Sequence, residues 1–216
     1  MTTSSSPKAS HWQDVYQRKP ADSVSWYRPH LETSLALLHQ AGLSPSSRVI
    51  DVGAGASTLV DDLVERGVAL VTVLDLSDQA LSVARARIGE RAGQVTWLAA
   101  DLLTAPLPEG GFDLWHDRAV LHFLTDPSDA ERYARQAFRA IRPGGRAVIG
   151  GFAPNGPERC SGLPVARRSP EDVATLLGPG FRLLGQVHES HITPGGSEQA
   201  FAWALLQRDP ESETLP

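Results

Sequence analysis

VIDVGAGAST, residues 49–58, is the stretch that decides the fold of this chain. The apolar run that ends at Asp51 is typical of a buried strand, and Ser57 stands where a helix can begin. Between them, Gly53 and Gly55 permit a tight turn in which the backbone can come close to a ligand. A strand, a glycine turn and a helix in this order favour a nucleotide-binding unit over a plain connection.

Short β-rich runs alternate with helical patterns along the chain, and this alternation predicts a parallel sheet covered by helices. The expected strands are residues 48–52, 70–74, 94–98, 112–116 and 146–152. The expected helices are residues 31–42, 57–67, 128–141 and 170–177. Two further strands, 181–190 and 197–208, flank ITPGG and predict an antiparallel hairpin that closes the sheet.

The length of 216 residues and the hydrophobic content of 41% predict one domain with a real core. We expect this domain to span residues 10–210, including an N-terminal lid at 10–30, with a disordered tail at 1–9 and another tail at 211–216. The first ten residues lack the apolar segment of a signal peptide, and no apolar run approaches the length of a bilayer.

Charge and cysteine content narrow the expected partners and compartment. The formal net charge of −5 argues against a nucleic-acid or membrane-surface binder and favours a small-molecule or protein partner. The single cysteine, Cys160, excludes an internal disulfide and a multi-cysteine zinc site, so we expect a cytoplasmic protein. The sequence predicts no oligomeric state.

Two more carboxylates follow strands next to the glycine turn. Asp75 ends the expected second strand, 20 residues after Gly55, where a carboxylate can accept hydrogen bonds from both hydroxyls of a ribose. Asp101 ends the third strand beside the same crevice. Three acids at neighbouring strand ends favour a ligand with positive charge and several donors, and they would repel a pyrophosphate. The pattern D-x-G-x-G also differs from the G-x-G-x-x-G of dinucleotide sites.

With these residues in place, the chain resembles the class I S-adenosylmethionine-dependent methyltransferases. The matching pieces are VIDVGAGAS, TVLDLS, the AAD of residues 99–101, FDLWHDRAVLHFL (112–124), RPGG before the fifth strand, and the terminal hairpin. The resemblance implies a Rossmann-like α/β fold with helices on both faces of a seven-stranded, mostly parallel sheet. Its implied strand order is 3-2-1-4-5-7-6, with the last strand antiparallel.

The resemblance also implies S-adenosyl-L-methionine as cofactor and assigns roles around it. Asp51 and the turn Gly53–Gly55 would lie beside the methionine moiety, Asp75 on the ribose, and Asp101 on the adenine amine. Asp117 and Arg118 would lie on the floor nearest the cofactor. The implied cofactor-binding set is Asp51, Gly53, Ala54, Gly55, Asp75, Leu76, Asp101, Leu102, Asp117 and Arg118.

Four aromatic residues crowd into the N-terminal stretch, namely Trp12, Tyr16, Trp26 and Tyr27. The stretch resembles the lid of methyltransferase-like lysine methyltransferases and of thiopurine-methyltransferase relatives, which covers the cofactor and part of the acceptor pocket. A lid suits methyl transfer, because in-line displacement benefits from orientation and from exclusion of water. The alternative is simple hydrophobic packing against the sheet edge.

An amine or hydroxyl acceptor can require a general base, and the candidates are His116, Asp117, His122, His188 and His191. His122 also suits a role as a wall residue near the cofactor. Cys160, in the long loop after the fifth strand, and His188, on the hairpin, are candidate substrate or lid residues. Two histidines and a carboxylate could form a metal triad, but no second carboxylate has matching spacing, so no metal is expected.

The expected function is therefore transfer of a methyl group by in-line displacement to an unidentified small molecule or protein side chain. Two other interpretations stay open, an NAD-dependent Rossmann oxidoreductase and a nucleotide-binding module without activity. The chain lacks the N-P-P-Y type of motif that is associated with methylation of amide or adenine nitrogens, and it lacks the Pro-Cys pair of cytosine-C5 enzymes. Amines, hydroxyls, thiols, carboxylates and metalloids all remain as possible acceptors.

Overall fold

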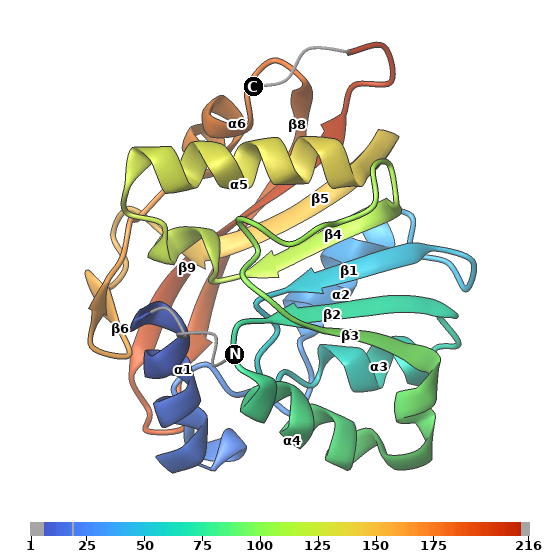
Figure 1. Cartoon of the computed structure of the whole chain (residues 1–216). Helices are drawn as coiled ribbons and strands as arrows, with labels where there is room; N and C mark the ends of the chain where they lie inside the picture. Colours follow the sequence, from blue (N-terminus) through green and yellow to red (C-terminus); the bar gives the residue numbers. More distant parts are fainter. Residues whose placement is uncertain (1–6, 19, 213–216) are drawn as a thin grey trace.

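Seven strands form the central sheet of the computed structural model, which describes residues 7–18 and 20–212 (Figure 1). Their order is β3-β2-β1-β4-β5-β9-β8. Because β9 is antiparallel to both neighbours and the other pairings are parallel, the predicted order and the antiparallel last strand are confirmed. The strands are β1 (Arg48–Val52), β2 (Leu70–Asp75), β3 (Val95–Ala99), β4 (Phe112–Arg118), β5 (Ile141–Phe152), β8 (Phe181–Ile192) and β9 (Glu198–Arg208).

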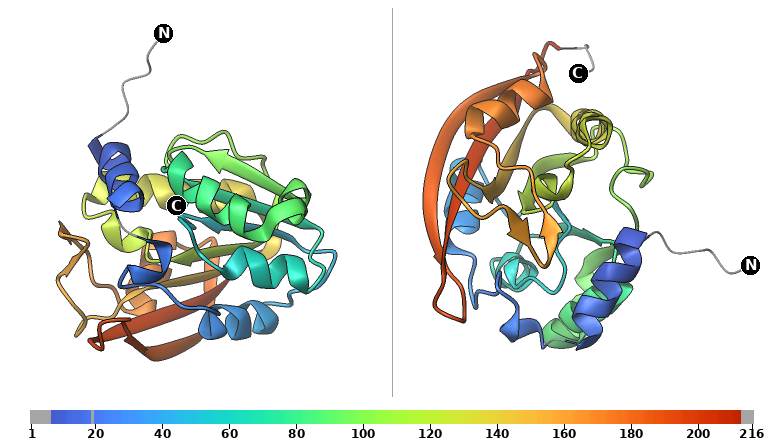
Figure 2. Two further views of the ribbon diagram at one scale, coloured as in Figure 1. Left: turned by 90° about the horizontal axis from the view of Figure 1, so that it is seen from below. Right: turned by 90° about the vertical axis from the view of Figure 1, so that its left-hand side faces the viewer.

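Helices cover both faces of this sheet (Figures 1 and 2). One hydrophobic cluster joins the sheet to α2, α3 and α4, and a second joins the opposite face to α5 and α6. At the N-terminus, α1 lies beside α4 (Figure 2). The helices are α1 (Pro7–Arg18), α2 (Glu32–Gln40), α3 (Leu59–Glu65), α4 (Asp78–Ile88), α5 (Pro127–Ala140) and α6 (Pro170–Leu177), with short 3₁₀-helices η1 (Ala21–Ser23), η2 (Gly89–Gln94) and η3 (Leu121–Phe123).

Local sequence signals explain where these helices begin. Ser77 precedes α4, and its hydroxyl accepts a hydrogen bond from the backbone N–H of Ala80 at 3.2 Å. Ser169 and Asp172 form a reciprocal capping box at the start of α6. The caps fix the first turn of each helix and so fix how each helix lies on the sheet.

The structure differs from the predicted boundaries in two regions. The fifth strand begins at Ile141, directly after α5, because Ile141 pairs with Phe112 and a register shift follows on β4. RPGG thus belongs to a bulged strand start and is no separate loop. The connection 153–169 contains a small ribbon of its own, formed by β6 (Arg159–Cys160) and β7 (Leu163–Pro164).

The N-terminal region also differs from expectation, since α1 begins at Pro7, inside the segment predicted as a tail. The remaining tail predictions, 1–6 and 213–216, lie outside the described residues. Within the described ranges, no helix is both long enough and apolar enough to cross a membrane.

Candidate active site

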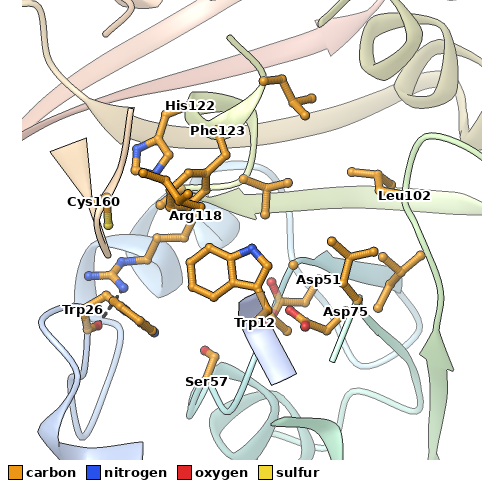
Figure 3. Close-up of a pocket in the computed structure, with 18 of the residues that line it drawn as sticks. Trp12, Trp26, Asp51, Ser57, Asp75, Leu102, Arg118, His122, Phe123 and Cys160 are labelled. Carbon is orange, nitrogen blue, oxygen red and sulfur yellow. Dashed lines mark hydrogen bonds between the residues drawn. The ribbon is translucent and has the colours of Figure 1, made fainter. Parts of the chain in front are cut away.

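The carboxyl ends of β1, β2 and β4 open into one pocket of about 340 Å³ (Figure 3). This is the edge at which open α/β sheets bind ligands, and the volume falls within the usual range for small-molecule sites. The pocket brings together most of the predicted site residues, namely Trp12, Tyr16, Trp26, Asp51, Gly53, Ala54, Asp75, Leu76, Asp101, Leu102, His116, Arg118, His122 and Cys160.

Side chains from distant segments of the chain pack closely against the glycine turn that follows β1. Gly53 has φ +60°, and a Cβ there would lie 1.9 Å from a methyl carbon of Val120. Gly55 has φ +57°, and a Cβ there would lie 2.0 Å from the Tyr16 hydroxyl. Both positions therefore need glycine for conformation and for space. Gly55 does not line the pocket, but it admits Tyr16 of α1 against the turn.

Asp75 at the end of β2 is buried at the pocket wall. Its carboxylate accepts hydrogen bonds from the backbone N–H of Gly55 at 2.8 Å and of Ser77 at 2.7 Å. Burial raises the pKa of Asp75 to about 6, against the effect of these two hydrogen bonds. The carboxylate thus holds the glycine turn in place and is ionised at neutral pH.

Asp51 and His116 form a buried pair with Ser34 of α2. The Nδ1 atom of His116 lies 2.7 Å from Oδ1 of Asp51, and Nε2 lies 2.9 Å from the Ser34 hydroxyl. All three side chains are almost fully buried. Both ring nitrogens of His116 are occupied, so His116 orients Asp51 and is poorly placed to take a proton from an acceptor.

The second oxygen of Asp51, Oδ2, is buried and has no hydrogen-bond partner in the described part of the chain. Such a buried carboxylate oxygen is costly unless a donor meets it. Asp51 lines the pocket, so a cationic or N–H-bearing ligand group there can supply the missing donor.

The third strand contributes Asp101, which lies at the pocket edge with Leu102. One of its carboxylate oxygens, Oδ1, accepts a hydrogen bond from the backbone N–H of Leu103 at 2.9 Å. Leu102 is buried and contacts the same pocket. A carboxylate beside an apolar wall can accept a hydrogen bond from a polar group of a ligand whose flat, apolar part packs on that wall.

Asp117 differs from the prediction, because the structure places it outside the pocket lining. The side chain is fully buried and accepts three hydrogen bonds, from the Tyr133 hydroxyl at 2.7 Å and from the backbone N–H groups of Val120 and Leu121 at 2.8 and 3.1 Å. Burial raises its pKa to about 6. Alternation along β4 explains the difference, because neighbouring side chains of a strand point to opposite faces.

Tyr133→Phe is expected to lower the free energy of unfolding by about 2 kcal/mol, because Asp117 and the indole N–H of Trp115 lose a buried partner together. Denaturant unfolding at pH 8 measures the loss. Cofactor affinity should stay within about twofold, since Tyr133 does not line the pocket. A large loss of affinity with unchanged stability would contradict the structural role.

Arg118 ends β4 and lines the pocket on the same side as His122 and Cys160 (Figure 3). Its Nη1 donates to the backbone carbonyl of Trp26 at 2.8 Å, and its guanidinium lies 5.3 Å from the Phe201 ring centre. Burial lowers the pKa of Arg118 to about 10, so the group stays cationic at neutral pH. Arg118 therefore fixes the N-terminal segment to the sheet and leaves further N–H groups for a ligand.

His122 lies on η3, above Arg118 in Figure 3. Its ring is buried, and neither ring nitrogen has a hydrogen-bond partner among the described residues. Burial, with Arg168 and Arg118 nearby, lowers the pKa of His122 to about 3. His122 is thus a neutral imidazole and a weak base, available for a hydrogen bond with a ligand.

The N-terminal segment contributes aromatic side chains to the pocket wall, where Trp12, Tyr16 and Trp26 line it. Trp12 packs edge-on against Phe123 and Trp26, with ring centres 5.1 and 5.9 Å apart. His191 of β8 ties the segment to the sheet, because its Nε2 donates a hydrogen bond to the backbone carbonyl of Ser25 at 2.7 Å. Tyr27 differs from the other aromatics, since it lines a small neighbouring cavity and does not line the main pocket.

Two further predicted residues can now be placed. His188 is exposed on the edge strand β8 and does not line the pocket, because it falls on the outward face of an alternating strand. Cys160 lines the pocket, and burial raises the pKa of its thiol to about 11, so it is a protonated thiol at neutral pH. No group of three or more potential metal ligands occurs in the described part of the chain.

Sequence reasoning missed the partners that orient the predicted residues. Ser34 was visible as a polar residue among leucines on the buried face of the helix 31–42, a pattern that indicates a specific hydrogen bond. Tyr133 lies on an alanine-rich buried face of α5, where a large hydroxyl-bearing ring again needs a partner. Their partners lie on other elements, so no local pattern could identify them.

Known proteins with similar sequences are methyltransferases. Residues 49–145 match the family model described as "Methyltransferase domain". The chain is 33% identical over 102 residues to the ubiquinone/menaquinone biosynthesis C-methyltransferase UbiE of Methylobacterium nodulans, an alignment covering 46% of this chain and 39% of that protein. It is 27% identical over 186 residues to the methyltransferase GfsG of Streptomyces halstedii, covering 83% and 61% of the two chains.

The fold is similar to a solved structure of 1,6-didemethyltoxoflavin-N1-methyltransferase from Burkholderia thailandensis, which contains 1,6-didemethyltoxoflavin and S-adenosylhomocysteine. The TM-score is 0.70 at 20% identity, and the superposition covers 97% of this chain and 92% of that one. The chain spans less than two thirds of the length of both curated relatives named above. The comparisons thus bear on the family and the fold, and they leave the acceptor open.

Proposed function

This chain belongs to the class I S-adenosylmethionine-dependent methyltransferases, and from that premise we propose that it moves a methyl group from S-adenosyl-L-methionine to an acceptor in the pocket. One observation carries the proposal. Asp51, Asp75 and Asp101 line the same pocket from neighbouring strand ends, and Asp51 retains a buried oxygen without a partner.

The residues of this half of the pocket fit the cofactor chemically. Oδ2 of Asp51 suits the ammonium group of the methionine moiety, because a buried carboxylate favours a cationic donor. Asp75 suits the ribose hydroxyls, and Asp101 with Leu102 suits the adenine amine and ring. The turn at Gly53 brings the backbone to the pocket wall without a side chain.

The bound cofactor supplies a methyl group on a sulfonium, which a nucleophile displaces in line. The chain contributes orientation and exclusion of water. Trp12 and Trp26 of the lid cover the pocket, and Arg118 ties the lid to β4 through the Trp26 carbonyl. His116 contributes by holding Asp51. We propose that the acceptor, a small molecule or a side chain, binds on the side of Arg118 and His122.

Calorimetric titration with S-adenosylhomocysteine and, separately, with NADH tests the cofactor assignment. We expect saturable binding of S-adenosylhomocysteine and no heat from NADH beyond dilution. Quenching of Trp12 and Trp26 fluorescence should follow the same binding curve, since both indoles line the pocket. Tight binding of NADH without binding of S-adenosylhomocysteine would overturn the proposal and favour an oxidoreductase.

A further inference from the structure

The pocket has two halves of opposite electrostatic character (Figure 3). Asp51 and Asp75 lie on one side of the Trp12 indole, and Arg118 and Cys160 lie on the other. The acidic half is the one that the proposed function assigns to the cofactor. The half around Arg118 has no assigned ligand, and its chemistry bears on the acceptor.

Arg118 carries a positive charge that no ion pair neutralises within the described residues. Glu189 is the carboxylate that raises the pKa of Arg118 most, but it already pairs with Arg28 at 3.6 Å and accepts a hydrogen bond from the indole N–H of Trp203 at 2.8 Å. The other charged groups that act on Arg118 are Arg28 itself and Asp51, and Asp51 is engaged by His116. A guanidinium that lines a pocket and has no counter-ion favours an anionic ligand.

His122 is a second, independent indication of a ligand. Its two ring nitrogens are buried in the pocket wall and have no partner within the part of the chain that the structure describes. Unpartnered buried polar atoms are rare in folded proteins. Because the imidazole is neutral, it can donate a hydrogen bond to an oxygen without adding charge, but it cannot remove a proton from a weakly acidic acceptor.

The walls of this half are aromatic. Phe123 and Phe152 pack against His122 with ring centres 4.3 and 4.9 Å away, and Phe201 lies beside Arg118. Flat apolar walls with a few convergent polar groups select a planar ligand. An aliphatic amine fits these surroundings poorly, because its ammonium form would meet the guanidinium.

We propose that the acceptor is an aromatic hydroxyl compound that binds as its phenolate, with the oxyanion at Arg118 and a hydrogen bond from His122. The inference rests on the proposed function and names its acceptor class. A lone pair of the phenolate oxygen forms the new O–CH₃ bond while the S–CH₃ bond breaks and leaves its electron pair on sulfur. The acceptor has already lost its proton to solvent, so no protein base is required, and the product is a neutral methyl ether.

The test uses 4-nitrophenol, whose anion and neutral form differ in visible absorption. The full-length protein is saturated with S-adenosylhomocysteine, and 4-nitrophenol is titrated with pH in its presence and absence. We expect the bound phenol to ionise about one pH unit lower than the free phenol, which corresponds to roughly tenfold tighter binding of the anion. 4-Nitroaniline, of similar shape but uncharged, should bind at least tenfold more weakly.

Arg118→Gln should abolish this shift, whereas Arg118→Lys keeps the charge and should retain part of it. Arg132→Gln is the matched control, because Arg132 is an exposed α5 residue paired with Asp129 at 2.8 Å and lies outside the pocket. If Arg118→Gln does not fold, the ionisation shifts of Arg118→Lys and Arg132→Gln are compared instead. Arg118→Lys should then show the smaller shift of the two.

Two outcomes overturn the inference, namely an unshifted ionisation of 4-nitrophenol in the wild-type complex, or 4-nitroaniline binding as tightly as the phenol. Either result with intact S-adenosylhomocysteine binding refutes only the acceptor class. Loss of S-adenosylhomocysteine binding itself would refute the proposed function, so the two failures are distinguishable.

Discussion

Asp75→Asn is expected to bind S-adenosylhomocysteine roughly 30- to 150-fold more weakly than the unaltered protein at pH 8, about 2–3 kcal/mol of binding free energy. The carboxylate lines the pocket and is ionised at this pH. Its charge strengthens each hydrogen bond that it accepts, and asparagine removes the charge and one acceptor. Calorimetric titration measures the change directly.

Asp78→Asn is the matched control. Asp78 stands three residues further along the chain, is exposed, and pairs loosely with Arg85 at 3.7 Å outside the pocket. Its substitution should leave the affinity within about twofold. Equal affinities for Asp75→Asn and the unaltered protein would mean that the ribose is held elsewhere and would remove Asp75 from the site.

The same carboxylate predicts a pH dependence. Burial raises the folded-state pKa of Asp75 from 3.8 to about 6, so S-adenosylhomocysteine affinity should fall as the pH drops below about 6 and the carboxylate takes up a proton. The free energy of unfolding depends on pH in the opposite direction to the affinity. Because the fold favours the protonated form, ionisation of Asp75 lowers the free energy of unfolding as the pH rises from about 4 to about 6.

Asp117 has a similarly raised pKa of about 6, so the unfolding curve of Asp75→Asn should retain part of this pH dependence. Measurements of affinity and of stability against pH therefore distinguish the contribution of Asp75 from that of Asp117. Affinity below pH 6 should follow Asp75 alone, whereas stability follows both. An affinity that is flat from pH 8 to pH 5 would contradict the assignment of Asp75 as an ionised acceptor.

The fold was predictable because its signals are local. The β1 run and the glycine turn appear within ten consecutive residues, and the alternation of strand and helix patterns fixes a parallel sheet. The full strand order came from the family resemblance and agrees with the structure. The start of β5 was missed, since Pro143 and the two glycines after it are usual loop residues and only pairing with β4 makes them part of a strand.

The site was less predictable, since its arrangement depends on contacts between distant segments. The acids at the strand ends follow from strand position alone, and the structure places Asp51, Asp75 and Asp101 together. The roles of His116 and Asp117 depend on Ser34 and Tyr133, residues 82 and 16 positions away along the chain. No spacing rule connects such pairs, so the sequence could name the cluster but not divide it into positioning and pocket residues.

Gly53→Ala is expected to lower the free energy of unfolding by about 3 kcal/mol and to abolish measurable binding of S-adenosylhomocysteine. Two effects add at this position. The backbone has φ +60°, which an alanine adopts only at a cost of about 1 kcal/mol. The new Cβ would also lie 1.9 Å from the Val120 methyl carbon, and such overpacking costs about 1–3 kcal/mol.

Gly67→Ala separates the two effects, because Gly67 has φ +76° and open space around the position of a Cβ. It should show the conformational cost alone and bind S-adenosylhomocysteine normally.

The double variant Gly53→Ala with Val120→Ala removes the overlapping methyl groups, and the closest remaining contact of the new Cβ is the Cβ of residue 120 at 3.2 Å. A double-mutant cycle should then give a favourable coupling of about 1–2 kcal/mol. Because the turn must move to accommodate Val120 in the single variant, cofactor binding should return in part with the double variant. Equal stability losses for Gly53→Ala and Gly67→Ala would show that close packing of Val120 on the turn is unimportant.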